Sequence, residues 1–388
     1  MSRRRIAIVT GSRAEYGLLY WPIRDMLDAQ DIEPLVIVTG MHLAPEFGLT
    51  VREIERDGIP ISARVDMLVS SDAPGGIAKS MALGLIGFSD AIERLRPDAM
   101  LVLGDRFEIL AAAQAAMVHN LPLVHIAGGD TTEGAFDEAI RHAITKMSHL
   151  HLVTNEIAHR RVVQMGENPR NVHIVGSPGL DHLCRRQLLD RVALEEALGS
   201  SLGARNALIT FHPVTLEPEE GIRQQEEMLA ALETLAEEWT LWFTMPNADT
   251  GGRGLGAALK AWVQKRPRAH VFASLGQLRY LSLMRQVDIV VGNSSSGLYE
   301  APSFKVPTVD IGDRQRGRLA AASVVHSAPN RGDIRVAIDR ALVLDCTGVE
   351  NPYGDGHSAA RIVNAVRAMP PADQLLKKSF HEVEVVRV

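Results

Sequence analysis

The feature that most constrains the fold of this chain is the alternation of short apolar runs with helical patterns along its whole length. Such alternation is typical of βαβ units, in which parallel strands form a sheet that helices cover on both faces. Nearly every apolar run is followed directly by glycine and by polar or charged residues. Ligands of open parallel sheets bind outside the carboxyl ends of the strands. The pattern therefore predicts an α/β enzyme with a ligand cleft between two domains. Strands are expected near residues 5–10, 35–39, 98–103, 121–126, 151–154, 172–176, 207–211, 239–245, 269–273, 288–292 and 307–311, and helices near 107–119, 219–237 and 357–369.

The length of the chain indicates how many domains it forms. Its 388 residues exceed what a single hydrophobic core usually serves, so two Rossmann-like domains are expected. The Gly-Ser-Pro-Gly segment at 176–179 is typical of a hinge. The expected domains are residues 1–176, with the tail 368–388 packing back on them, and residues 177–367.

Composition excludes several classes of function. A formal net charge of −6 argues against a general nucleic-acid binder, which needs a basic face. The apolar run after the arginines at 3–5 is too short for a signal peptide, and no stretch approaches the length of a membrane span. Cys184 and Cys346 lack metal-ligand spacing and are expected to be reduced thiols. We therefore expect a cytoplasmic protein with no membrane, nucleic-acid or metal partner, and nothing in the sequence requires a cofactor.

The first half carries candidate anion-binding and acid–base residues after its strands. Arg13 lies in a loop that opens a helix, where backbone N–H groups and a guanidinium suit a diphosphate, although the loop lacks the dinucleotide fingerprint. Asp105 and Arg106 follow a later strand. Asp105 is either a general base with Arg106 as its electrostatic partner, or the N-cap of the following Ala-rich helix.

Four carboxylates fall within nine residues after the strand that ends near 126. Mutual repulsion between neighbouring carboxylates shifts their pKa values, which suits acid–base chemistry. Glu133 and Glu138 also suit a helix N-terminus, and for these two we prefer that interpretation. The four residues are Asp130, Glu133, Asp137 and Glu138.

The second half contains the best anion site that the sequence predicts. Ser294 and Ser295 precede a helix, so that hydroxyls and N–H groups converge at its N-terminus, and Glu300 is placed to hold ribose hydroxyls. Arg314 adds a cation after the next strand. His212 follows another strand and could contact a phosphate or a leaving group, although a single histidine is more often structural.

Taken together, these motifs resemble the UDP-N-acetylglucosamine 2-epimerase family, and most closely its hydrolysing branch, from about residue 5 to about 367. That branch supplies manno-configured precursors of sialic- and legionaminic-type acids. The motifs that carry the resemblance are GSRAEYG, GDRFE, GGDTTEGAFDEAIRHAITKMSHLH, GSPGLD, FHPVT, GNSSSGLYE and GDRQRGR.

The resemblance implies a glycosyltransferase-B-like fold with a crossing C-terminal helix, and a dimer or a pair of dimers. It also implies a nucleotide-sugar substrate, elimination of UDP to a 2-acetamidoglycal, and hydration of that glycal to the free manno sugar. Glu300 would hold the ribose, and His42, Asp105 and Asp137 would lie near the sugar. The diphosphate side would be held by Arg13, Arg106, His212, Asn247, Ser294, Ser295 and Arg314.

One position departs from the family pattern. Where many relatives have glutamate, and some of the hydrolysing branch have histidine, this chain has Ala127. Alanine transfers no proton, so either Asp130 or Glu133 takes the role or the preferred sugar differs. Three other functions stay open on the sequence: a non-hydrolysing epimerase, a glycosyltransferase of the same fold, and a non-catalytic nucleotide-sugar sensor.

Overall fold

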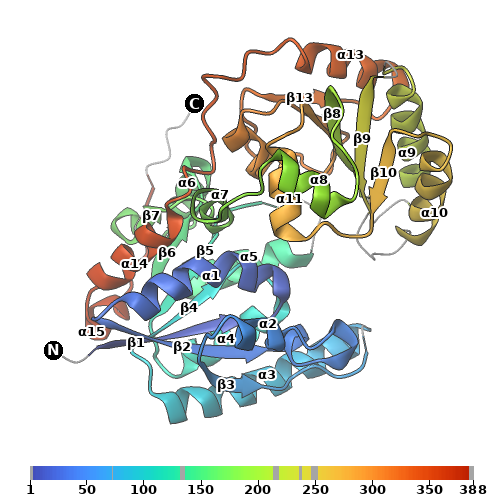
Figure 1. The fold of residues 1–388 in the computed structure, drawn as a ribbon. Coiled ribbons are helices and arrows are strands. Elements are labelled where there is room, and N and C mark those ends of the chain that lie inside the picture. The colour runs from blue at the N-terminus through green and yellow to red at the C-terminus, as the bar shows by residue number, and fades with distance from the viewer. Residues whose placement is uncertain are drawn as a thin grey trace. The chain divides into compact units, whose positions relative to one another are not determined.

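The computed structural model describes residues 3–71, 73–131, 136–212, 218–235, 238–245 and 252–383. The chain forms two compact units, residues 1–182 with 353–388 and residues 183–352 (Figure 1).

The first unit is built on an open parallel sheet. Over the described residues it has seven strands in the order β3-β2-β1-β4-β5-β6-β7, and every neighbouring pair is parallel. Its strands are β1 (Arg4–Thr10), β2 (Ile32–Thr39), β3 (Ile61–Val65), β4 (Ala99–Leu103), β5 (Leu123–Ile126), β6 (Leu150–Val153) and β7 (Val172–Ile174). Its helices are α1 (Arg13–Asp28), α2 (Val51–Arg56), α3 (Pro74–Leu95), α4 (Phe107–Val118), α5 (Phe136–Met147), α6 (Glu156–Gln164), α14 (Ser358–Ala368) and α15 (Ala372–Leu375), with short 3₁₀ turns at 40–42, 45–47, 169–171 and 178–180.

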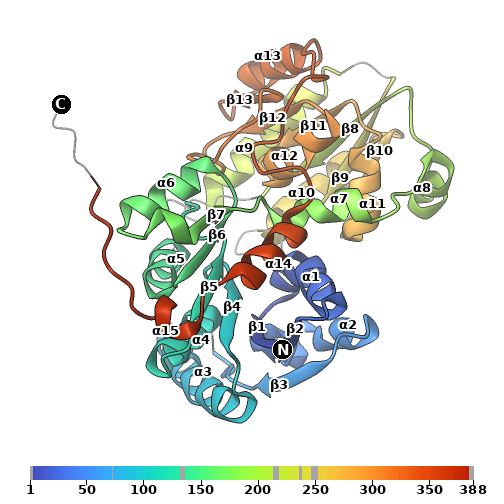
Figure 2. The same ribbon diagram turned by 90° about the vertical axis from the view of Figure 1, so that its left-hand side faces the viewer.

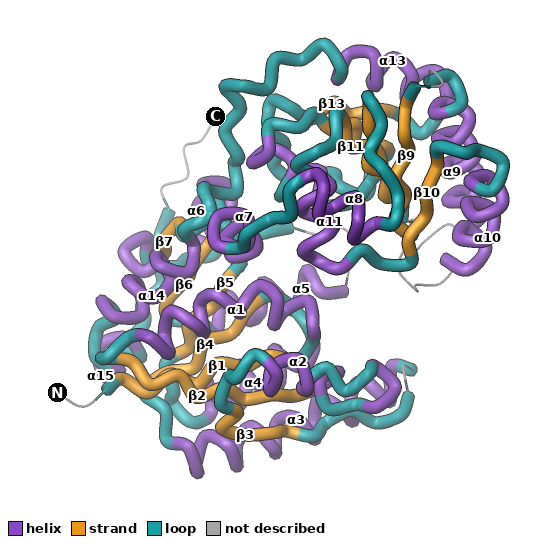
Figure 3. Tube along the Cα trace, in the orientation of Figure 1, coloured by secondary structure: helices purple, strands orange, loops and turns teal. Residues whose placement is uncertain are grey.

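The alternation of side chains along β1 explains why this sheet has two covered faces. Ile6 and Ile8 lie in a core that includes side chains of α1 and α14, whereas Ala7 and Val9 lie in a core with side chains of α3 and α4. All four are fully buried. Because successive strand residues point to opposite faces, a continuous apolar strand requires helices on both sides. Figure 3 shows these helices around the strands of the unit.

The second unit repeats this scheme with a smaller sheet. Six strands are described, in the order β10-β9-β8-β11-β12-β13, again with parallel neighbours. The strands are β8 (Arg205–Thr210), β9 (Trp239–Thr244), β10 (Ala269–Phe272), β11 (Ile289–Gly292), β12 (Thr308–Ile311) and β13 (Val324–Ser327). The helices are α8 (Arg191–Leu198), α9 (Pro218–Leu232), α10 (Gly252–Val263), α11 (Gly276–Met284), α12 (Ser296–Tyr299) and α13 (Arg331–Ala341), with a 3₁₀ turn at 301–304; α7 (Asp181–Arg185) joins the two units.

The C-terminal segment is held on the first unit by specific bonds. The buried carboxylate of Asp181 accepts the backbone N–H groups of Ser358 and Ala359, both at 2.8 Å, and so caps the start of α14. At the other end of α14, Arg4 donates to the carbonyl of Val366 at 2.6 Å. These contacts place α14 with the first unit, whereas the sequence boundaries at 176 and 367 group this helix with the second.

The α/β class predicted from the sequence is confirmed in both units. Each predicted strand corresponds to an observed one, and α4 spans Phe107–Val118 against an expected helix near 107–119. β3 and β13 were not predicted. Both are short edge strands whose apolar residues are interrupted by partly or fully exposed polar ones, such as Arg64 and His326. No helix in the described ranges is long and apolar enough to cross a bilayer.

Candidate active site

The loop after β4 presents Asp105 and Arg106 at the carboxyl end of the first sheet. Gly104 adopts φ +78°, a conformation that glycine tolerates, and the chain turns there into α4. The N-cap of α4 is Arg106, without a side-chain capping bond. Asp105 therefore does not cap the helix, which removes the structural alternative considered for it and leaves its carboxylate for other contacts.

Arg141 on α5 holds the acidic residues of this edge together. Its guanidinium pairs with the Asp105 carboxylate, donates to the Asp130 carbonyl at 2.7 Å, and contacts the Glu138 carboxylate at 3.3 Å. The side chain of Arg141 is buried. Sequence reasoning gave Arg141 no role. Arg141 lies four residues after Asp137, so both residues are on one face of the helix. This spacing was the sequence signal from which a role for Arg141 could have been inferred.

Asp137 lies in the first turn of α5, and the charges of Asp105 and Arg141 act on its pKa as well. Burial and the neighbouring charge of Asp105 raise the pKa of Asp137, while Arg106 and Arg141 oppose that rise. The structure thus brings Asp105, Asp137 and Arg106 into one electrostatic cluster around Arg141. A carboxylate with a raised pKa is a stronger base than a free aspartate, which suits proton abstraction.

Asp130 and Ala127 lie in the loop after β5. The Asp130 carboxylate accepts a hydrogen bond from the Thr154 hydroxyl at 2.8 Å. Ala127 adopts φ +63°, an uncommon conformation for a residue with a side chain, and its amide donates to the carbonyl of Leu152 at 3.0 Å. Glu133, the other candidate for the missing proton-transfer role, lies outside the described residues.

Arg13 and His42 differ in how accessible they are. Arg13 is exposed and pairs with Glu53 at 3.2 Å. His42 is fully buried; its Nε2 lies 3.0 Å from the Thr10 hydroxyl and its Nδ1 2.7 Å from the Thr50 hydroxyl. Burial lowers the pKa of His42 to about 4, so the ring is neutral at pH 7. A sugar contact by His42 stays a prediction, because both ring nitrogens already have partners.

Two buried glutamates, Glu15 of α1 and Glu108 of α4, lie close to Gly11 in the loop between β1 and α1. Glu108 is fully buried and pairs with Arg106 at 2.9 Å, while Glu15 accepts the N–H of Gly11 at 2.9 Å. Burial, and after it the charge of Glu108, raises the pKa of Glu15 to about 8. Glu15 is therefore mostly protonated at neutral pH, and Glu108 is the carboxylate that faces Arg106.

This arrangement predicts a pH-dependent stability. Because Glu15 ionises less readily in the folded than in the unfolded chain, the free energy of unfolding falls as pH rises from about 4.5 to about 8 and levels off above. We expect Glu15→Gln to keep the Gly11 bond and to stabilise the first unit by about 2–4 kcal/mol at pH 8.5, with little effect at pH 4.5. Hydrogen exchange of the β1 amides measures this, and identical pH profiles for both proteins would contradict it.

In the second unit, His212 and Asn293 connect the ends of two neighbouring strands. The His212 N–H donates to Asn293 Oδ1 at 2.7 Å, and Asn293 Nδ2 donates back to the His212 carbonyl at 2.8 Å. Both residues are buried. This reciprocal pair holds the loop after β8 against the loop after β11. Asn247, predicted to contact the diphosphate, lies outside the described residues.

The serines after β11 form a chain of hydroxyl groups. Ser296 Oγ lies 2.5 Å from the Tyr280 hydroxyl and 3.0 Å from Ser294 Oγ, and Ser295 is the N-cap residue of α12. Ser294 and Ser295 are thus at the start of a helix, as predicted. Tyr280 was not identified from the sequence, because its contribution from α11 depends on tertiary packing.

Glu300 and Arg314 both follow this serine loop in the chain. Arg314 Nη1 donates to the Asn293 carbonyl at 3.0 Å, and Gln315 Nε2 donates to the same oxygen at 2.8 Å. Glu300 Oε2 is buried and has no hydrogen-bond partner among the described atoms. Burial raises the pKa of Glu300 to about 7. A buried, unpartnered carboxylate oxygen is costly unless a ligand supplies the hydrogen bond.

Each unit thus has an open parallel sheet with charged or hydroxyl-rich loops at the carboxyl ends of its strands. Two such Rossmann-like units define an α/β enzyme of the glycosyltransferase-B-like class. Residues 25–367 match the family described as UDP-N-acetylglucosamine 2-epimerase, and the chain belongs to this family.

Three bacterial proteins are similar to this chain over most of its length. A Campylobacter jejuni protein named GDP/UDP-N,N'-diacetylbacillosamine 2-epimerase (hydrolyzing) is 41% identical over 331 residues, which cover 85% of this chain and 86% of that protein. The Escherichia coli polysialic acid biosynthesis protein P7 is 37% identical, covering 94% and 93%. The Legionella pneumophila UDP-N,N'-diacetylbacillosamine 2-epimerase (hydrolyzing) is 34% identical, covering 97% and 98%.

Solved structures share the fold. The Neisseria meningitidis UDP-GlcNAc 2-epimerase bound to UDP-GlcNAc has a TM-score of 0.75 at 19% identity, covering 94% of this chain and 99% of that one. The Methanocaldococcus jannaschii UDP-GlcNAc 2-epimerase in complex with UDP-GlcNAc and UDP has a TM-score of 0.74 at 18% identity, covering 94% and 99%. These likenesses confirm the predicted fold class.

Proposed function

We propose that this chain is a hydrolysing 2-epimerase that converts UDP-N,N'-diacetylbacillosamine, or the related UDP-N-acetylglucosamine, to the free manno-configured sugar and UDP. Two relatives that are 41% and 34% identical have N,N'-diacetylbacillosamine and the word hydrolyzing in their names, the first with GDP/UDP as the nucleotide and the second with UDP. The observation that carries the proposal is the cluster of Asp105 and Asp137 around Arg141, because it supplies carboxylates for proton transfer at C2.

The reaction begins with an elimination. An aspartate of the cluster removes the C2 hydrogen as a proton, and the C1–oxygen bond breaks with its electron pair passing to the diphosphate. The products are UDP and a 2-acetamidoglycal with a C1–C2 double bond. Departure of the diphosphate gives C1 cationic character and so acidifies C2. Positive and hydrogen-bond-donating groups near the departing phosphate stabilise the charge that develops there, and we assign this role to Arg13 and His212, with Arg106 and Arg314.

The second step is a hydration. Water adds its hydroxyl to C1 while a proton is delivered to the face of C2 opposite to the one that lost it, which inverts that carbon. We assign the proton transfers to Asp105 and Asp137. Asp130 is our candidate for the role that Ala127 cannot perform, because its carboxylate follows Ala127 in the same loop and its carbonyl is bound by Arg141. Glu133 is the alternative.

The uridine half is assigned to the second unit. Ser294, Ser295 and the neighbouring N–H groups suit a phosphate, and Asn247 is proposed to assist on the same side. Glu300 is proposed to accept the ribose hydroxyls, which would supply the hydrogen bonds that its buried Oε2 lacks.

The ribose assignment predicts a selective loss of affinity. Hydrogen bonds to a charged group contribute about 1.5–3 kcal/mol, so Glu300→Gln is expected to weaken UDP binding about 10- to 100-fold. Binding of 2'-deoxy-UDP should change much less. Because the pKa of Glu300 is about 7, the wild-type preference for UDP over 2'-deoxy-UDP should grow as pH rises from 6 to 8. Calorimetric titration at both pH values measures this, with the exposed Glu350→Gln as control; an unchanged preference in Glu300→Gln would rule out the ribose contact.

The activity itself is tested by incubating the pure protein with each nucleotide sugar without an acceptor. We expect UDP and free manno sugar in equal amounts. A non-hydrolysing epimerase would give the epimerised nucleotide sugar without UDP, a transferase would release UDP only with an acceptor, and a sensor would give neither. Any of these three results would overturn the proposal. Comparing the two substrates at equal concentration shows which sugar is preferred.

A further inference from the structure

A buried glutamate beside α5 binds three side chains that come from distant parts of the first unit. Glu167 follows α6, and its side chain is 2% exposed. Its Oε1 lies 2.5 Å from Lys146 Nζ, and its Oε2 lies 2.7 Å from Lys378 Nζ and 3.0 Å from His151 Nε2. Burial opposes the ionisation of Glu167, but these three hydrogen bonds outweigh it and lower its pKa to about 2. Glu167 is therefore a carboxylate at neutral pH.

Lys378 connects this glutamate to the C-terminal end of α5. In addition to the bond with Glu167, its ammonium donates to the backbone carbonyls of Lys146 and Ser148, both at 2.7 Å. An ammonium carries three donors, so these three acceptors use all of them. The last carbonyls of a helix have no partner within the helix, and a cation at that end also interacts favourably with the helix dipole. Lys378 therefore caps α5 from a position 230 residues away from Ser148 in sequence.

The residues on both sides of this lysine are fixed by separate contacts. Leu375 of α15 is buried in the core that also includes side chains of α14. The N–H of His381 donates to the carbonyl of Gly166 at 2.9 Å. The ring of Phe380 lies so close to the same glycine that a Cβ on Gly166 would be 2.3 Å from it. These contacts fix residues 376–381, which we call the tail segment, on the first unit.

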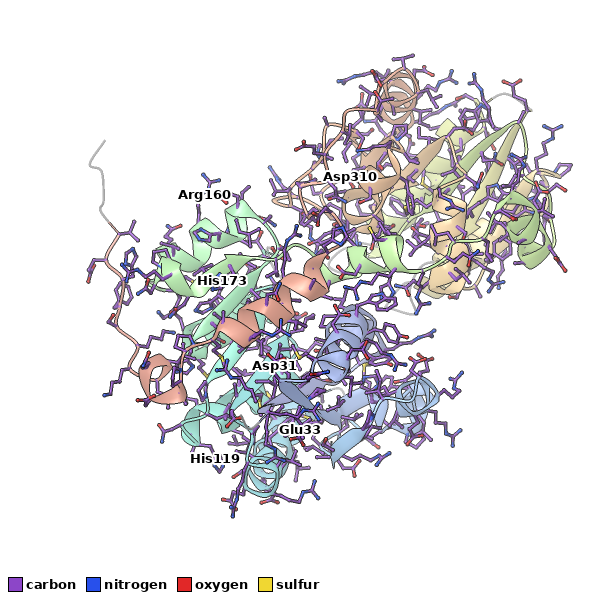
Figure 4. The ribbon with its side chains drawn as sticks, turned by 60° about the vertical axis from the view of Figure 1, so that its left-hand side comes forward. Asp31, Glu33, His119, Arg160, His173 and Asp310 are labelled. Atoms are coloured by element: carbon purple, nitrogen blue, oxygen red, sulfur yellow. The ribbon has the colours of Figure 1, made fainter. Side chains whose placement is uncertain are left out.

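The tail segment runs along the side of the unit that carries α5 and α6. Figure 2 shows it in red, beyond α15 and beside these two helices. Its partner Gly166 lies in the turn after α6, and Figure 4 labels Arg160 of α6 and His173 of β7 on either side of this turn in the chain. The tail segment thus touches both the end of α5 and the turn that leads to β7.

α5 carries the arginine that organises the candidate active site. Asp137 lies in its first turn, and Arg141 pairs with Asp105. The helix has 12 residues, and helices of fewer than about 12–15 residues are marginal without tertiary contacts. From Asp137 to Lys146 its axis extends about 14 Å. Contacts at its C-terminal end therefore contribute directly to how firmly Asp137 and Arg141 are held against the loop after β4.

We propose that the tail segment holds α5 in place for the reaction and that Lys378 is a positioning residue. This role rests on the proposed function, which assigns the proton transfers to Asp105 and Asp137. Lys378 acts through α5 and not on the sugar itself. Without its ammonium, the helix loses its C-terminal cap and Glu167 loses one of its cations. Asp137 and Arg141 then move more widely relative to Asp105, so that the geometry which proton transfer needs is reached less often.

Lys378→Met in the full chain tests this role. Methionine fills most of the same space and removes all three donors. We expect kcat to fall about 10- to 100-fold, because a displacement of about 1 Å can cost up to about 100-fold. The KM for the nucleotide sugar and the Kd of UDP should stay within about 2-fold of wild type, because the uridine contacts are assigned to the second unit. Amide hydrogen exchange over residues 142–147 should become at least about 10-fold faster, with that of β8 unchanged.

Two other variants separate positioning from a general loss of structure. Lys378→Arg keeps a cation with several donors and should have a kcat at least about 3-fold above that of Lys378→Met. Phe380→Ala leaves the lysine in place but removes the ring that lies on Gly166. Phe380 is 64% exposed, so this variant is expected to fold, and its exchange over residues 142–147 should still rise, with a fall of about 3-fold in kcat.

Two matched controls alter the same unit without touching α5. Lys377→Met removes the neighbouring exposed ammonium and should keep the wild-type kcat. Arg4→Met removes the 2.6 Å bond to the Val366 carbonyl at the end of α14, and should lower the stability of the first unit without lowering kcat.

A wild-type kcat in Lys378→Met would overturn the proposal. So would unchanged exchange over residues 142–147, or a loss of kcat in Arg4→Met as large as that in Lys378→Met. A wild-type chain that releases no UDP from a nucleotide sugar would instead refute the proposed function, and the exchange of α5 in Lys378→Met then decides whether the tail segment holds this helix.

Discussion

Replacing Asp105 or Asp137 by asparagine is expected to lower kcat about 10²- to 10⁴-fold, the usual contribution of a positioned acid or base. Each substitution keeps the size of the side chain and its ability to accept a hydrogen bond, but removes the proton-transfer group. Because the two residues belong to one cluster around Arg141, the kcat of the double variant should be only slightly lower than that of the less active single variant. Single-turnover assays with mass spectrometric detection of UDP measure the loss.

UDP affinity separates this effect from a loss of structure. The uridine contacts are assigned to the second unit, so both variants should bind UDP within about 2-fold of wild type. Asp339→Asn, at an exposed ion pair on α13, is the matched control and should retain full turnover. If either asparagine variant turned over at the wild-type rate, that aspartate would have no part in the chemistry.

Replacing Arg141 by methionine is expected to have the largest effect on stability and to abolish turnover as well. Arg141 is buried, and its removal leaves the Asp105 carboxylate and the Asp130 carbonyl without their shared donor. Removing one partner of a buried ion pair lowers the free energy of unfolding by about 3–5 kcal/mol. Hydrogen exchange of the β4 and β5 amides should report this loss in the first unit.

A second variant of Arg141 shows whether stability and turnover depend on its charge alone or also on the shape of its guanidinium, and a variant of the exposed Arg335 serves as the control. Arg141→Lys keeps the charge but not the planar fork, and should recover part of the stability while leaving kcat low, because one ammonium cannot hold the same partners in the same geometry. Arg335→Met removes an exposed pair with Asp339 and should cost less than about 1 kcal/mol. Equal stability of Arg141→Met and wild type would show that Arg141 does not organise the cluster.

The placement of candidate residues at strand ends could be predicted because it follows from the parallel sheet alone. Asp105 and Arg106 follow β4, and Ser294 follows β11, as their apolar runs indicate. Which residues from other parts of the chain lie next to each loop could not be predicted in the same way. Glu15 and Glu108 come together because β1 and β4 are adjacent in the sheet, although they are 93 residues apart in sequence. Strand order is a tertiary property that the apolar pattern does not contain.

The role of Arg141 was missed for a related reason. An arginine on an amphipathic helix is usually solvated, and only the packing of α5 against the loops after β4 and β5 buries its guanidinium. In contrast, α4 was predicted closely, because an Ala-rich segment has a strong helical preference independent of its neighbours.

Turnover in heavy water tests most directly whether an aspartate removes the C2 proton while UDP departs. The purified protein is incubated with UDP-N,N'-diacetylbacillosamine in D₂O, and the free sugar is examined by proton NMR and mass spectrometry. We expect one deuterium at C2 of the manno product and one UDP released for each sugar formed. A product that retains its original hydrogen at C2 would contradict the proposed elimination and hydration.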